Sequence, residues 1–166
     1  MARGLGETTI TISVLDRLID LEPDNKAENL LSRSQSLRLL RAAVRRDLEW
    51  LLNSRRIADA PDEGMKEVNR SAYVYGLPDL SSLTMVAAAD RSRLMRQILA
   101  TINLFEPRLS NVRIAMVEKD DPGKKDVRLR IEAMLRTDPV PEPISFDSVI
   151  ELKSGNCHLV GGDDAR

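Results

Sequence analysis

The chain has 166 residues, of which 42% are hydrophobic and 31% charged, and its 25 basic and 26 acidic residues leave a net charge of −1. Because the charges nearly cancel and only 3% of the residues are aromatic, the composition argues against nucleic-acid binding and against a sugar cleft lined with aromatic rings. The absence of a ~20-residue apolar run and of a secretory signal, and the presence of a single cysteine, predict one cytoplasmic domain without direct membrane insertion.

The first 35 residues are predicted to form a separate, partly flexible segment. Apolar residues at helical spacing between 10 and 21 indicate a short amphipathic element, with Thr11 or Ser13 as possible caps. The sequence Glu22-Pro23-Asp24-Asn25 interrupts this pattern, and a polar stretch follows. The segment is therefore expected to act as a tether that docks at a distance or on a partner.

A long helix is predicted from about Ser36 to Asn53. One apolar arc of this helix consists of Leu37, Leu40, Val44, Leu48, Leu51 and Leu52. Leu39, Ala43 and Trp50 form a second, narrower stripe on roughly the opposite side. Two interpretations remain open: both stripes are buried within the domain, or the Trp50 stripe meets another subunit.

An irregular stretch from 55 to 83 separates this helix from the next. It contains a loop at 60–64, a short extended piece at 73–75 and a turn at 76–79 that positions Tyr75 and Leu77. A second helix, capped by Asp90 or slightly earlier, is predicted to end at about Phe105. Its apolar face consists of Leu94, Met95, Ile98, Leu99, Ile102 and Phe105.

The second helix stops at the sequence Phe105-Glu106-Pro107-Arg108-Leu109. Pro107 has no amide hydrogen and restricts the residue before it, so Glu106 and Arg108 are presented on a stiff corner. A carboxylate and a guanidinium in this position can contact a partner, brace the fold or take part in chemistry.

Beyond the corner the apolar period changes to that of strands. Alternating residues predict strands at 112–116, 127–135, 144–153 and 157–160, with a polar hairpin loop at 119–126 and an irregular, proline-rich stretch at 137–143. The predicted fold class is α+β, in which two main helices pack on a three- to four-stranded, mainly antiparallel sheet. The domain is expected to span 36–160, followed by a disordered tail at 161–166.

Three motifs in this order resemble a known family. They are Arg45-Arg46-Asp47-Leu48-Glu49-Trp50-Leu51-Leu52-Asn53-Ser54-Arg55-Arg56, Tyr75-Gly76-Leu77-Pro78-Asp79-Leu80 and the corner sequence at 105–109. With the opening 13–18, they make the chain similar to TssE, a baseplate subunit of bacterial type VI secretion systems, over about residues 12–160. TssE itself is similar to the wedge protein of contractile phage tails, in a wider family that carries the label "lysozyme-like".

The resemblance implies a structural role in protein secretion, without a cofactor or bound metal. TssE-like subunits join TssF, TssG and TssK in the wedges of a cytoplasmic baseplate that is docked on the inner-membrane complex. This baseplate surrounds the spike hub VgrG and starts the contractile sheath of TssB and TssC. By similarity, Glu106, Pro107 and Arg108 occupy the family's EPR motif, which is associated with wedge and sheath contacts. Together with Trp50 and Tyr75 they are the predicted partner-binding residues.

The same residues allow other interpretations. Glycoside hydrolysis needs two carboxylates, and Glu106 has a cation two residues away and no second acid marked by spacing, so catalysis is not expected. An internal salt bridge between Glu106 and Arg108 remains open. Cys157 and His158 are neighbours on a strand and point to opposite faces, so Cys157 is expected in the core and not in a metal site. The alternative function is that of a stand-alone anti-adaptor-like regulator of the same fold family.

Overall fold

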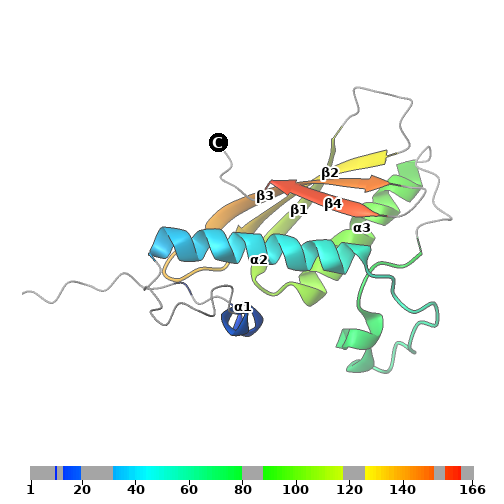
Figure 1. Cartoon of the computed structure of the whole chain (residues 1–166). Helices are drawn as coiled ribbons and strands as arrows, with labels where there is room; N and C mark the ends of the chain where they lie inside the picture. Colours follow the sequence, from blue (N-terminus) through cyan, green and yellow to red (C-terminus); the bar gives the residue numbers. More distant parts are fainter. Residues whose placement is uncertain are drawn as a thin grey trace, which may run out of the picture.

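The computed structural model describes residues 10, 13–19, 32–79, 88–117, 126–151 and 156–161 (Figure 1). The predicted break at 22–25, the possible cap Thr11, residues 119–125 of the predicted hairpin loop and residues 162–166 of the predicted tail lie outside the described residues. Asp126 of that loop and Gly161 of that tail instead belong to strands. The elements in chain order are α1 (Val14–Leu18), α2 (Arg33–Asn53), η1 (Val68–Arg70), η2 (Ala72–Val74), α3 (Ala88–Phe105), β1 (Leu109–Val117), β2 (Asp126–Leu135), β3 (Glu142–Glu151) and β4 (Cys157–Gly161).

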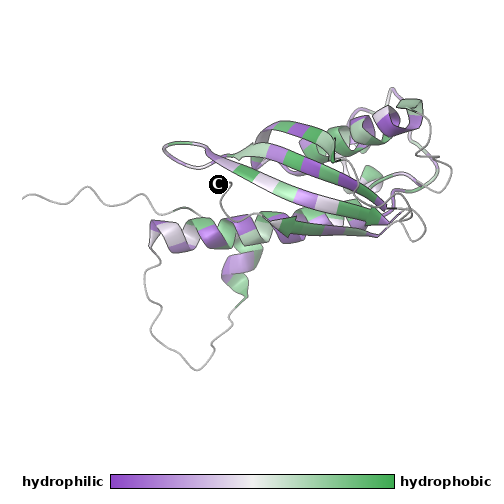
Figure 2. Ribbon diagram, turned by 90° about the horizontal axis from the view of Figure 1, so that it is seen from above, coloured by the Kyte–Doolittle hydropathy of each residue, from purple (hydrophilic) through white to green (hydrophobic). Residues whose placement is uncertain are grey.

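The four strands form one antiparallel sheet in the order β1-β2-β3-β4. Residues alternate between buried and exposed along β2 and β3, and Figure 2 shows this alternation as bands of colour along the strands. The two long helices lie below the sheet in Figure 1, where α3 contacts β1 and α2 contacts β4. Their buried residues join the inward-facing strand residues in a single core, and this confirms the predicted α+β fold.

Local signals explain where the helices begin and end. Ser32 and Gln35 form a reciprocal capping box, so α2 begins at Arg33, earlier than the predicted Ser36. In α3, Asp90 lies within the first turn and not at the cap, so the earlier of the two expected starts applies. The predicted end of α3 at Phe105 is confirmed.

The strands are longer than predicted at two places. β1 begins at Leu109 because Asn111, with a φ of 52°, makes an irregularity in the register with β2 that allows pairing on both sides of it. The proline-rich stretch was expected to be irregular up to Pro143. This was wrong, because Pro143 belongs to β3 and pairs with Met134 of β2. A proline is tolerated there because, among the described residues, β4 pairs with β3 only from Phe146 onward, which leaves Pro143 at a sheet edge.

A strap of residues 55–79 returns to the end of α2. The predicted extended piece at 73–75 is instead the turn η2, which the Ser71 side chain caps by accepting from Tyr73 N. Leu77 N donates to Ser54 O at 2.9 Å and Arg56 N donates to Leu77 O at 2.8 Å, so the strap forms a short bridge with the chain after α2. The predicted turn thus inserts Leu77 into the core and places Tyr75 beside the end of α3.

The single cysteine lies in the core, as predicted, and His158 beside it is exposed. Asn53, the last residue of α2, bonds both backbone groups of Cys157: its Nδ2 donates to Cys157 O, and its Oδ1 accepts from Cys157 N, each at 2.8 Å. These two hydrogen bonds occupy backbone groups of β4, an edge strand, that would otherwise be open to pairing with another chain.

Burial raises the pKa of the Cys157 thiol to about 12, and the negative charge of Glu49 adds to this effect. The folded pKa lies above the ordinary value of 9.0, so the stability that the neutral thiol contributes is complete below pH 9 and is lost as the pH rises towards 12. We expect the difference in unfolding free energy between the wild type and Cys157→Ala to shrink over this range in urea titrations. At pH 8 a thiol reagent should label Cys157 only after unfolding, and rapid labelling of the folded chain would contradict its burial.

Candidate functional site

The corner between α3 and β1 is fixed by backbone hydrogen bonds on both sides of its proline. Glu106 N still donates to Ile102 O at 2.8 Å, and Leu109 N donates to Glu106 O at 3.2 Å, which closes the turn over Pro107. Arg136 N donates to Arg108 O at 2.8 Å and so joins the corner to the residue after β2. The stiff corner predicted from the sequence is therefore present.

Glu106 is a buried carboxylate held by Arg108. Its side chain is 4% exposed, and its two oxygens accept from Arg108 Nε, at 2.6 Å, and from Arg108 Nη2. The same Nη2 donates to Asp47 Oδ2 of α2 at 2.7 Å. The internal salt bridge, left open by the sequence, is thus part of the geometry, and Arg108 also ties the corner to α2.

The charged contacts continue from the corner along α2 to α1. Asp47 Oδ1 accepts from Arg46 Nε at 2.9 Å, and Arg46 Nη1 donates to Asp16 of α1. The hydrogen bond from Arg46 lowers the pKa of Asp16, and the hydrogen bonds to Glu106 raise the pKa of Arg108. Acidic and basic groups alternate along this chain of contacts, so each buried or half-buried charge has a partner of opposite sign.

Tyr75 lies at the same corner. Its ring meets Phe105 edge to face, with centroids 5.1 Å apart and an angle of 70° between the rings. Burial raises the pKa of Tyr75, and the negative charges of Asp47 and Glu106 contribute to the rise. The strap, α2 and the end of α3 therefore meet around the Glu106 carboxylate.

Trp50 lies on the outer side of α2 and not at the corner itself. It is 56% exposed, and the guanidinium carbon of Arg46 lies 5.2 Å from the centre of its ring. Leu39 is 44% exposed whereas Ala43 is buried, so the interpretation that the whole second stripe is buried within the domain was wrong. The first stripe is buried as predicted, except that Leu37 is partly buried against the core.

Sequence reasoning missed three residues of this network: Asp16, Arg46 and Asp47. It used these residues only for the family resemblance, as parts of the stretches 13–18 and 45–56. The sequence shows Asp47 directly after Arg46, and this neighbouring pair of opposite charges was the available signal for an ion-pair network. Only the fold shows that Arg108 lies next to Asp47.

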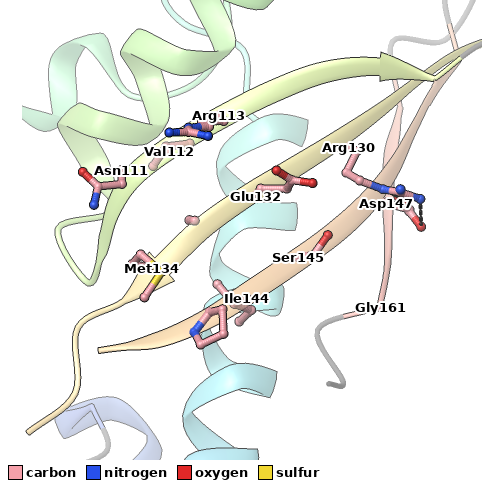
Figure 3. Close-up of a pocket in the computed structure, with 12 residues that line it drawn as sticks. Asn111, Val112, Arg113, Arg130, Glu132, Met134, Ile144, Ser145, Asp147 and Gly161 are labelled. Atoms are coloured by element: carbon pink, nitrogen blue, oxygen red, sulfur yellow. Dashed lines mark hydrogen bonds and ion pairs between the residues drawn. The ribbon is translucent and has the colours of Figure 1, made fainter. Parts of the chain in front are cut away.

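The outer face of the sheet carries a separate hollow of about 860 Å³ (Figure 3). Arg130 Nε donates to Asp147 Oδ1 at 2.8 Å across its floor, and Arg113 and Glu132 face each other from neighbouring strands. Within the described parts of the chain, no group of three or more His, Cys, Asp or Glu residues is placed to hold a metal ion. The described helices also include none that is long and apolar enough to cross a membrane.

Residues 38–140 match the family described as baseplate wedge protein gp25, and the match includes the corner, Trp50 and Tyr75. The chain belongs to this family of structural baseplate components, which confirms the predicted resemblance to baseplate wedge proteins.

Comparison with curated proteins gives no match. Among solved structures, a chain of the structure described as "The baseplate complex from the type VI secretion system" has 17% sequence identity and a TM-score of 0.47. The alignment covers 68% of the present chain and 95% of that chain.

Proposed function

We propose that the chain is the TssE-like wedge subunit of a type VI secretion baseplate. In this role it joins TssF, TssG and TssK in the wedge, at a cytoplasmic baseplate docked on the inner-membrane complex. It contributes to docking of the TssB and TssC sheath around the VgrG hub for effector delivery. The observation that carries the proposal is the gp25 family match, which spans the corner at 106–108, taken with the order of the three TssE-like motifs.

The corner supports the proposal because, among the described residues, one nitrogen of the Arg108 guanidinium is left without an acceptor. Its Nε and Nη2 brace Glu106 and Asp47, but Nη1 has no acceptor among the residues that the structure describes. Arg108 is partly exposed and Pro107 is exposed, so a neighbouring subunit can approach both. The contacts with Glu106 and Asp47 then orient the planar guanidinium of Arg108 towards a carboxylate or carbonyl of the partner.

A catalytic role is not proposed. Glu106 is 4% exposed and both of its oxygens accept from Arg108, so the carboxylate is buried in an ion pair and is not presented to a substrate. The second carboxylate at the corner, Asp47, binds the same Arg108, so both acids are paired with a cation, unlike the two acids that flank a sugar in glycoside hydrolysis.

The test is affinity purification of the tagged full-length chain from the cells that produce it. Recovery of TssF, TssG and TssK together supports the proposal, whereas recovery of a single adaptor protein supports the anti-adaptor alternative and contradicts it. Arg108→Lys keeps a cation beside Glu106 but loses the planar fork, so we expect near-normal thermal unfolding with a several-fold lower recovery of wedge proteins. Arg130→Lys, which alters an exposed pair on the sheet, is the matched control and should leave recovery unchanged.

A further inference from the structure

α1 is attached to the domain through its polar side. Asp16 accepts from Arg46 of α2 and from the Ser13 hydroxyl, and the Ser13 oxygen caps the helix by accepting from Asp16 N. Figures 1 and 2 both place α1 beside the middle of α2. The ion pair therefore fixes which side of α1 faces the domain.

The apolar side of α1 faces outward. Val14 is 70% exposed and Leu18 is 76% exposed, and Leu15 and Ile19 are also exposed. An amphipathic helix on a domain surface normally buries this side and exposes its polar residues. Apolar residues gathered on an exposed face are typical of interaction sites.

The outer side of α2 extends this apolar area. Leu39, Arg46 and Trp50 are separated by seven and four residues, so they lie along one side of the helix. Arg46 binds Asp16 and also lies over the Trp50 ring, so it connects α1 to the exposed tryptophan. We call the exposed side chains of Val14, Leu15, Leu18, Ile19, Leu39 and Trp50 the α1–α2 surface.

Among the described residues, the charges beside the α1–α2 surface that have no partner are positive. Arg17, Arg38 and Arg45 are exposed, and none of them has a hydrogen-bond or ion-pair partner in the described part of the chain. Of the acids that the structure describes here, Asp16 and Asp47 are paired with arginines, and Glu49 lies 3.5 Å from His158. A partner that brings carboxylates to this rim would neutralise these arginines.

We propose that the α1–α2 surface binds an amphipathic helix of another protein, whose apolar stripe is bordered by Asp or Glu residues. The two elements that form the surface are helices, which bond their own backbones, so the partner must be recognised through side chains and not by strand addition. A symmetric contact with a second copy would bring the same arginines together. The net charge of −1 and the small number of cations on the rim disfavour an anionic membrane.

The test uses the full-length chain and two designed helical peptides with the same leucine stripe, one bordered by Glu and one by Lys. Trp50 is the only tryptophan, so its fluorescence reports directly on this surface. We expect the Glu peptide to shift the emission to shorter wavelength and to bind about tenfold or more tightly than the Lys peptide at low salt, with the preference declining as salt rises. Leu18→Asp should weaken binding of the Glu peptide by about tenfold or more, and Arg38→Glu with Arg45→Glu should reverse the preference between peptides.

Val160→Asp is the matched control and should not affect binding, because this exposed apolar residue of β4 pairs with Asp147 on the outer face of the sheet, away from the helices. Circular dichroism should show all variants folded, because the altered side chains are exposed. The proposal is overturned if both peptides bind equally, or if Leu18→Asp has no effect. It is also overturned if the chain alone self-associates through this surface in sedimentation, or if it binds phosphatidylserine vesicles in preference to the peptide. The assay contains no baseplate protein, so its failure leaves the proposed function standing.

Discussion

Arg108→Ala is expected to lower the free energy of unfolding by about 3 kcal/mol, because it leaves the Glu106 carboxylate buried without its cation. Arg108 supplies the side-chain contacts to both oxygens of Glu106 and a third contact to Asp47. No other cation among the described residues contacts Glu106. Urea or guanidinium unfolding followed by circular dichroism measures the loss.

A double-mutant cycle separates two contributions to the unfolding free energy: the interaction between Glu106 and Arg108, and the cost of leaving the Glu106 carboxylate buried without a cation. Glu106→Gln combined with Arg108→Ala should be less destabilising than Arg108→Ala alone, since the charge that needed compensation is gone. Arg130→Ala, which removes a salt bridge whose two side chains are 48% and 57% exposed, is the control and should cost less than about 1 kcal/mol. Equal losses for Arg108→Ala and Arg130→Ala would show that Arg108 does not brace the corner.

The expected instability changes how functional experiments on Arg108 are interpreted. A chain that lacks Arg108 will fail to assemble for two reasons, the lost partner contact and the weakened corner. Arg108→Lys separates these effects, because an ammonium group can remain beside Glu106 while the fork that suits a bidentate partner is lost.

The sequence predicts well those features that depend on local pattern. The apolar arcs of α2 and α3 and the alternation in β2 follow directly from the periods of helices and strands, and they define the α+β class. The stop at Phe105 is equally local, because Pro107 acts on the residues next to it. The sequence therefore predicts the rigid turn at Pro107 but not its side-chain contacts.

The contacts of the corner depend on the tertiary fold and could not be read in the same way. Asp47 and Arg108 are 61 positions apart, and no local rule pairs them. The outward orientation of α1 was also hidden, because its sequence has ordinary amphipathic spacing and only the bond between Asp16 and Arg46 shows which side faces the domain. The short extended piece predicted near Tyr73 failed because the Ser71 cap and the return of the strap to Ser54 override strand propensity.

Gly76→Ala is expected to cost about 3 kcal/mol through backbone strain and a steric clash. Gly76 has a φ of +100°, which residues with a side chain rarely adopt, and an added Cβ would lie 2.5 Å from Ser54 O. Ser54 O is the acceptor for Leu77 N, so relief of the clash must break the bridge that holds the strap to the end of α2. Thermal or denaturant unfolding of the variant measures the cost.

Gly64→Ala is the matched control, because an added Cβ there meets nothing within 4 Å and φ is not in the positive range. Its effect on unfolding should be within about 0.5 kcal/mol. The two glycines lie in the same strap, so equal stability of the two variants would contradict the tight return at Gly76.

If the return is tight, Gly76→Ala should also withdraw Tyr75 from Phe105, and the emission or the near-ultraviolet dichroism of the tyrosines should change. Recovery of wedge proteins should then fall although Glu106 and Arg108 are intact, because the strap helps to build the corner that we propose the partner contacts.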